Sequence, residues 1–272
     1  IRWLGIMKRI SNLKVVSFIC SRRDKNLRDL IAMHFQKNSM DSTEAQHFAG
    51  KFGFAATTMY GRTGSVAIHA LRTRAHEENE SALNSYLREA LIYVSFLLDK
   101  FGTAEILLTG EDRDVIVIFS DASCKASRVV ERSKSGKVKN KLNKQVGVER
   151  LDVQLGWSTY LNKKRHKAGF IMVPQAYITR WRKKQPIGIG EALAVVCAAK
   201  HALEDRRDVD TFLFIDNIGA ERSIRRGSSK QHVTALISHE FHLFLAERGC
   251  RIWTSYVASA LNESDEPSRD GT

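Results

Sequence analysis

Four carboxylates lie where strand ends and a helix start could bring them together. They are Asp121 after the apolar run 115–120, Glu191 in "PIGIGEALAVV", Asp216 after "TFLFI", and Asp265 in the polar segment "NESDEPSRDGT". Each has an ordinary structural explanation, because Asp is common in the turn after a strand and Glu in the first turn of a helix complements the helix dipole. It is their order along the chain that suggests chemistry.

The expected chemistry is metal-dependent phosphodiester cleavage. If strand 115–120 lies beside the strand that ends at Asp216, Asp121 and Asp216 emerge at one edge of the sheet, and the intervening helix start delivers Glu191 there. Crowded carboxylates repel one another unless divalent cations neutralise them, and ligation by oxygen alone suits Mg²⁺, with Mn²⁺ as a substitute. Two such ions about 4 Å apart would activate water and stabilise the leaving oxygen.

The elements that must position these residues divide the chain into two parts. Residues 1–108 are expected to be mainly helical after a strand-like opening, and Asp41 three residues before Glu44 resembles a capping box. Residues 109–272 alternate short β-rich runs with helices, which predicts an α/β fold with a mixed sheet. In this sheet a three-strand meander is followed by helix, strand, helix and strand. The expected helices are 24–36, 41–59, 82–101, 191–204 and 232–249, and the expected strands are 115–120, 155–161, 168–173, 211–216 and 250–257.

The excess of basic residues predicts a polyanionic partner, nucleic acid above all. The net charge of the 272 residues is +13. Lysine and arginine attract phosphates, whose neutralisation releases condensed counterions. Plain solubility, or a basic organellar background, would explain the same charge.

Two segments concentrate this charge. Segment 125–150 carries nine Lys or Arg against two Glu and separates the first two strands of the meander by far more than the roughly two to five residues of a hairpin loop. It is either a solvated insertion or a basic arm that folds against phosphates. The run "RWRKKQP" precedes the helix that carries Glu191. The expected phosphate contacts are Lys134, Lys137, Lys139, Lys141 and Lys144 in the first segment and Arg180, Arg182, Lys183 and Lys184 in the second.

The composition argues against a membrane protein and against a zinc site. No window reaches the roughly 18 uninterrupted apolar residues that a membrane span needs. The four cysteines form no C-x-x-C pair. This spacing fits reduced thiols in an intracellular protein.

Five short motifs, taken together, resemble the ribonuclease H domain of retroelement reverse transcriptases, of the gypsy-like and tyrosine-recombinase types. They are "SDAS" (120–123), "GW" (156–157), "GEALAVVCA" (190–198), "FIDN" (214–217) and N-x-x-D-x-P-S-R (262–269). The resemblance implies that four acidic residues bind two Mg²⁺ ions and that the RNA strand of RNA–DNA hybrids is cut to 5′-phosphate and 3′-hydroxyl ends. Carried over to this sequence, the ligands are Asp121, Glu191, Asp216 and Asp265, and the neighbouring expected nucleic-acid contacts are Asn217, Asn262 and Arg269.

The first part of the chain is similar to the region before ribonuclease H in such polyproteins. "WLGIMKRISNLKV" and "STEAQHFAGKFGFAATTMYGR" resemble the end of a polymerase palm and the thumb or connection region. No Tyr-x-Asp-Asp motif occurs in the sequence, so the resemblance implies a reverse-transcriptase tail without a polymerase core. The insertion 125–150, Ala258 and Ser264 depart from the family pattern.

Three functions are compatible with these features. The first is the Mg²⁺-dependent nuclease, in the nucleus or cytoplasm if the chain acts as a retroelement protein does. The second is a non-catalytic RNA-binding structural subunit of a ribonucleoprotein, such as an organellar ribosome in a mitochondrion or another organelle. The third is an unrelated basic α/β binding module, which would leave the four acids scattered in space.

Overall fold

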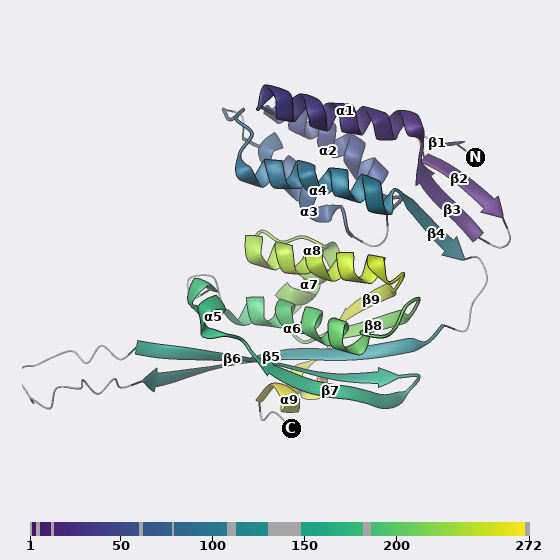
Figure 1. The fold of residues 1–272 in the computed structure, drawn as a ribbon. Coiled ribbons are helices and arrows are strands. Elements are labelled where there is room, and N and C mark those ends of the chain that lie inside the picture. The colour runs from purple at the N-terminus through teal and green to yellow at the C-terminus, as the bar shows by residue number, and fades with distance from the viewer. Residues whose placement is uncertain are drawn as a thin grey trace, which may run out of the picture.

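The computed structural model describes residues 2–3, 6–11, 14–59, 62–77, 79–107, 113–129, 148–181 and 186–269 (Figure 1). The described chain contains two sheets, with strand orders β1-β2-β3-β4 and β7-β6-β5-β8-β9. Within these ranges every helix is too short or too polar to cross a membrane.

The first sheet and four helices form the N-terminal unit. The expected strand-like opening is a hairpin of β2 and β3. Strand β1 pairs with β2, and β4, which follows the fourth helix of the unit, pairs with β3. Helices α1, α2 and α4 correspond to the expected helices, whereas α3 and β4 were not predicted. The strands are β1 (Arg2–Trp3), β2 (Ile6–Ser11), β3 (Lys14–Ile19) and β4 (Thr103–Leu107), and the helices are α1 (Ser21–Lys37), α2 (Ser42–Ala56), α3 (Ser65–Ala75) and α4 (Ser85–Phe101).

The expected capping box begins α2. The Asp41 side chain accepts a hydrogen bond from the Glu44 backbone N–H (2.8 Å), and the Glu44 side chain accepts one from the Asp41 N–H (2.9 Å). Two N–H groups that the helix itself leaves without partners are thereby satisfied.

The second sheet confirms the predicted mixed topology. The antiparallel meander is β5 (Val115–Val129), β6 (Val148–Leu161) and β7 (Lys164–Met172). Strand β8 (Asp210–Ile215) pairs parallel to β5, and β9 (Arg251–Tyr256) pairs parallel to β8. A meander followed by two parallel strands is the strand arrangement that the motifs implied.

Helices cover this sheet on both sides (Figure 1). The expected helices are α6 and α8, which pack on one face, and the short α9 lies on the other. Helices α5, α7 and α9 were not predicted. The bounds are α5 (Gln175–Trp181), α6 (Pro186–Ala202), α7 (Ile218–Arg226), α8 (His232–Glu247), the 3-10 turn Ser259–Leu261 and α9 (Asp265–Arg269).

Several predicted boundaries were wrong, and two of them concern the carboxylates. Strand β5 does not stop before Asp121 but continues to Val129, because its antiparallel pairing with β6 runs on past the end of β8. Helix α6 begins at Pro186, whose fixed φ suits a first helical position, so Glu191 lies in the second turn rather than the first. The predicted insertion 125–150 thus begins and ends within paired strands, and residues 130–147 lie outside the described ranges.

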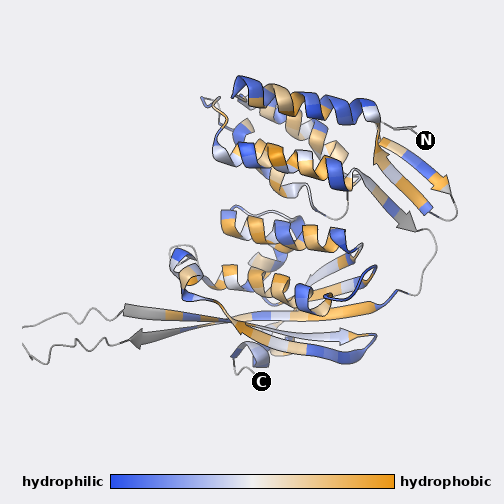
Figure 2. Cartoon of the chain, viewed as in Figure 1, coloured by the Kyte–Doolittle hydropathy of each residue, from blue (hydrophilic) through white to orange (hydrophobic). Residues whose placement is uncertain are grey.

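Two hydrophobic clusters form the core, and α8 contributes to both. Phe241 and Leu245 belong to the cluster between the second sheet and its helices, while Leu243 and Ala246 pack with the N-terminal unit. Figure 2 shows hydrophobic residues concentrated on α6, on α8 and on the part of β5 beneath α6. The expected boundary between residues 108 and 109 lies outside the described ranges, so the division into two domains stays a prediction.

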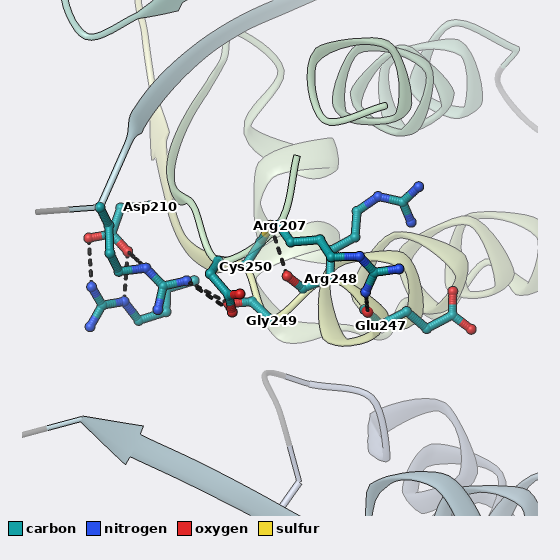
Figure 3. Close-up of polar contacts among 9 residues, drawn as sticks. Arg207, Asp210, Glu247, Arg248, Gly249 and Cys250 are labelled. Atoms are coloured by element: carbon teal, nitrogen blue, oxygen red, sulfur yellow. Dashed lines mark hydrogen bonds and ion pairs between the residues drawn. The ribbon is translucent and has the colours of Figure 1, made fainter. Parts of the chain in front are cut away.

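Several arginines have structural partners at the edge of the second sheet where β8 and β9 begin (Figure 3). Arg207 donates to the carbonyl of Glu247 (2.9 Å), and Arg248 donates to that of Leu203 (3.1 Å), which satisfies carbonyls at helix ends. Arg251 makes two 2.7 Å bonds to Asp210. Part of the basic excess therefore supports the fold rather than a partner.

The capping box predicts a stability effect that can be measured. Asp41→Ala removes the acceptor for the Glu44 N–H and should lower the free energy of unfolding by about 1 kcal/mol. Urea denaturation followed by circular dichroism measures this. Asp29→Ala, at an exposed position within α1, is the matched control and should change stability by less than about 0.5 kcal/mol. Equal effects of the two substitutions would contradict a role for the cap.

Candidate metal centre

The parallel pairing of β5 with β8 places Asp121 beside Asp216. The last residues in register are Ser120 and Ile215, so Asp121 is the next residue of β5 and Asp216 directly follows the end of β8. The expectation that these two strands are neighbours is confirmed. At Asp121 the pairing of β5 with β8 has ended, but the pairing with β6 continues, and Gly156 stands opposite.

A close approach of α6 to the sheet brings Glu191 to the same place. The preceding residue is Gly190, where a Cβ would lie 3.1 Å from Val153 Cγ1 and 3.3 Å from Ala122 Cβ. A larger residue would require α6 or its neighbours Val153 and Ala122 to shift by a few tenths of an ångström. Glu191 itself is buried, with 5% of its surface exposed.

Asp121, Glu191 and Asp216 form a cluster of three carboxylates. One oxygen from each lies within 4.8 Å of the other two. Asp121 and Glu191 are buried and Asp216 is half-buried. Glu191 Oε2 and Asp216 Oδ1 are buried without a hydrogen-bond partner. Buried carboxylate oxygens normally have partners, so these two oxygens require an explanation.

Burial and mutual repulsion disfavour the charged form of this cluster. Burial, followed by repulsion from Asp121 and Asp216, raises the pKa of Glu191 to about 9. Burial also raises the pKa of Asp121, against a hydrogen bond from Ser268 that lowers it and with repulsion from Asp216 and Asp265 that adds to the increase. A bound cation would reverse this balance by stabilising every ionised carboxylate around it.

The donor set fits a hard divalent cation. All three ligand groups are carboxylates, which suit Mg²⁺ or Mn²⁺. The two unpartnered oxygens, Glu191 Oε2 and Asp216 Oδ1, are available to such an ion. Among the described residues this is the one group of three acidic, His or Cys side chains close enough to share a metal.

Asp265, the fourth expected ligand, lies near the cluster but outside it. It begins α9, and its Oδ1 accepts an ion-pair contact from Arg269 Nη2 at 2.7 Å. Its charge still reaches Asp121, whose pKa it helps to raise. Asp265 was expected to bind metal and Arg269 to bind nucleic acid, but here the two side chains form an ion pair with each other.

Ser268 and Gly156 have roles at the site that sequence reasoning missed. A Cβ on Gly156 would lie 2.2 Å from the Ser268 backbone nitrogen, so only glycine allows α9 to rest on β6. The fully buried Ser268 hydroxyl donates to Asp121 Oδ2. Gly156 belongs to the "GW" motif and Ser268 to the N-x-x-D-x-P-S-R motif. Their contact, however, depends on the pairing of β5 with β6, which the motifs do not specify.

The expected nucleic-acid contacts have different surroundings. Asn217 caps α7 by accepting from the Ala220 N–H (3.0 Å), and the buried Asn262 donates to the Ser120 carbonyl (3.2 Å). Arg180 is exposed in the last turn of α5. The remaining predicted contacts lie outside the described residues: Lys134, Lys137, Lys139, Lys141, Lys144, Arg182, Lys183 and Lys184.

Known proteins show a distant likeness to this chain. No family model matches it, and no curated protein matches it. Three solved structures are similar. The N-terminal ribonuclease H domain of a Mycobacterium tuberculosis protein, fused to maltose-binding protein, has 10% identity and a TM-score of 0.37, over 54% of this chain and 85% of that one. Ribonuclease H1 of the halophilic archaeon Halobacterium salinarum has 14% identity and a TM-score of 0.36, over 55% and 90%. The prototype foamy virus protease–reverse transcriptase has 13% identity and a TM-score of 0.35, over 58% of this chain and 19% of that one.

The raised pKa of Glu191 predicts how stability depends on pH in metal-free buffer. The folded state keeps a proton up to about pH 9 that the unfolded state releases near pH 4.5. The free energy of unfolding should therefore fall as pH rises through this window. Glu191→Gln, which cannot ionise, should lose part of this fall. Urea titrations in EDTA at pH 5, 7 and 9 measure the free energy of unfolding of both proteins. If the wild-type and Glu191→Gln values differ by the same amount at every pH, the raised pKa of Glu191 is contradicted.

Proposed function

We propose that this protein is a Mg²⁺-dependent ribonuclease H-type endonuclease that hydrolyses the RNA strand of RNA–DNA hybrids. The observation that carries the proposal is the buried cluster of Asp121, Glu191 and Asp216, with two unpartnered oxygens. Buried like charges are costly, and stability alone gives no reason to keep three together. Their place, just beyond the parallel pairing of two strands, is where ligands of α/β sheets commonly bind.

In this proposal, Asp121, Glu191 and Asp216 hold the metal ions, and Asp265 completes the second site. Two bound Mg²⁺ ions would activate a water molecule and stabilise the leaving oxygen. To bind the second ion, the Asp265 carboxylate must leave its ion pair with Arg269 and turn toward the cluster. An i,i+4 pair of this kind is worth only about 0.3–0.5 kcal/mol, so little free energy opposes the exchange. Arg269 is then available to a substrate phosphate.

The substrate would be recognised through backbone and shape. RNA is distinguished from DNA by its 2′-hydroxyls and by the wide minor groove of the hybrid rather than by base edges. The basic segments 125–150 and 180–184 would supply phosphate contacts. Residues 1–108 would then be a thumb- or connection-like region, and the chain would derive from a retroelement reverse transcriptase.

The second candidate function, a non-catalytic RNA-binding subunit of a ribonucleoprotein in an organelle, is favoured by a basic groove on the N-terminal unit. The groove, about 380 Å³, lies between α1 and α2 and is lined by Arg23, Gln46, His47, Gly50, Lys51 and Phe54. The Arg23 guanidinium stacks over the Phe54 ring at 4.8 Å, and its Nη1 is buried without a hydrogen-bond partner. Arg23 also lies in the first turn of α1, where the helix dipole disfavours a cation. These features suit a phosphate backbone.

The nuclease proposal predicts loss of cleavage in variants of the cluster. With Mg²⁺ and a labelled RNA–DNA hybrid, Asp121→Asn and Asp216→Asn should each lower the cleavage rate at least 100-fold, because each removes a charged ligand of the ions. The variants should still bind the hybrid. Gel analysis of the products measures the rate and the position of the cut.

Asp205→Asn is the matched control, because Asp205 is exposed and lies outside the cluster. It should cleave at the wild-type rate. Tight hybrid binding without cleavage by the wild-type protein would reject the nuclease and favour the RNA-binding subunit.

The groove predicts a salt-dependent contribution to affinity. Arg23→Ala combined with Lys51→Ala should weaken binding to a hybrid about tenfold and reduce the slope of log K against log salt by about 2, because each of the two cations would neutralise one phosphate. Fluorescence anisotropy at several salt concentrations measures both. Lys200→Ala, which removes one surface charge paired with Glu240, should change affinity less than about twofold. An unchanged slope in the double variant would exclude the groove as a binding surface.

A further inference from the structure

We propose that Ser268 is a positioning residue that holds the Asp121 carboxylate in the orientation needed for metal binding. The proposal rests on the proposed function and assigns a role to a residue on the face of the sheet opposite α6. Asp121 lies on a strand, Glu191 on α6 and Ser268 on α9, so three separate elements meet at one carboxylate.

The backbone contact between α9 and β6 is the basis of this arrangement. A Cβ on Gly156 would lie 2.2 Å from the backbone nitrogen of Ser268 and 2.5 Å from its Cα. Gly156 is also the residue paired with Asp121 across the β5–β6 ladder. The glycine thus opens room for α9 beside the carboxylate, and at position 156 no side chain separates the helix from the sheet.

Side chains of the sheet fix the end of α9 in this position. Ser123 donates to the Ser268 carbonyl, and Gln154 Nε2 donates to the Pro267 carbonyl at 2.8 Å. The two donors are paired with each other across β5 and β6, two residues along the ladder from the Asp121–Gly156 pair. These two bonds hold the backbone of Pro267 and Ser268 against the sheet, and Ser268 has 0% exposure.

The hydroxyl has one proton and two nearby acceptors. It donates to Asp121 Oδ2 and also lies 2.9 Å from the Asp265 carbonyl oxygen. One proton serves one acceptor at a time, and an ionised carboxylate is the stronger acceptor. The bond to Asp121 occupies Oδ2 and restricts rotation of the carboxylate, so less rotational freedom is lost when a metal ion binds.

Groups that orient metal ligands commonly account for 10- to 100-fold in metal affinity. Ser268→Ala removes the bond to Asp121 but none of the carboxylates. We expect the Kd for Mn²⁺, measured by calorimetry on the full chain, to rise about tenfold. We also expect the Mg²⁺ concentration for half-maximal cleavage to rise, and kcat to fall while KM for the hybrid stays the same.

Ser264→Ala is the matched control. Ser264 is equally buried in the same segment, and its hydroxyl donates to Asn262 Oδ1 at 2.7 Å rather than to a carboxylate of the cluster. It should lower the melting temperature comparably and leave Mn²⁺ affinity unchanged. Wild-type Mn²⁺ affinity in Ser268→Ala, or an equal loss in Ser264→Ala, would overturn the assignment. If Ser268→Ala does not fold, Ser268→Cys carries the same expectation, because a thiol is a weak donor, and wild-type affinity in that variant would overturn it.

The same measurements separate this assignment from the proposed function. A wild-type protein that binds Mn²⁺ and cleaves the hybrid, together with a Ser268→Ala variant that behaves identically, would reject only the role of Ser268. A wild-type protein that neither binds Mn²⁺ nor cleaves would overturn the nuclease and this assignment with it.

Discussion

Electrostatic repulsion among three carboxylates, two buried and one half-buried, is the constraint on which the rest of this structure depends. Asp121, Glu191 and Asp216 are brought within 4.8 Å of one another in a setting that removes most of their water. Burial and repulsion raise the pKa of Asp121 and that of Glu191. Two of their oxygens lack a protein donor altogether. A fold that keeps such a cluster is suited to a cation, because a divalent ion turns the repulsion into attraction.

Two glycines allow the layers of the fold to meet at these carboxylates. Gly190 lets α6 approach β5 and β6 from one face, and Gly156 lets α9 rest on β6 from the other. Each glycine is adjacent to, or paired with, a residue of the cluster. The distances inside the site are therefore set by backbone approach rather than by long side chains, and this gives buried groups a defined geometry.

Net charge is a poor guide to where a partner binds. Arg207 and Arg248 satisfy carbonyls at the ends of α8 and α6, and Arg251 pairs with Asp210, all at the edge where β8 and β9 begin (Figure 3). Arg23 differs from them, because one of its nitrogens is buried without a partner in a groove. Separating arginines that complete the fold from those that lack partners locates binding surfaces better than a count of charges does.

The sequence by itself determined the order of the five strands of the second sheet and of helices α6 and α8, the capping box at Asp41 and the four carboxylates, because these depend on local periodicity and on residues a few positions apart. It did not determine where β5 ends, since that depends on pairing with β6, or where α6 begins. The i,i+4 spacing of Asp265 and Arg269 could have predicted their ion pair, but the two residues were assigned separate roles, one on metal and one on nucleic acid. The bond between Ser268 and Asp121 joins residues 147 positions apart. Only the tertiary structure could decide it, because the strand register and the absence of a side chain at Gly156 together set the distance that α9 keeps from the sheet.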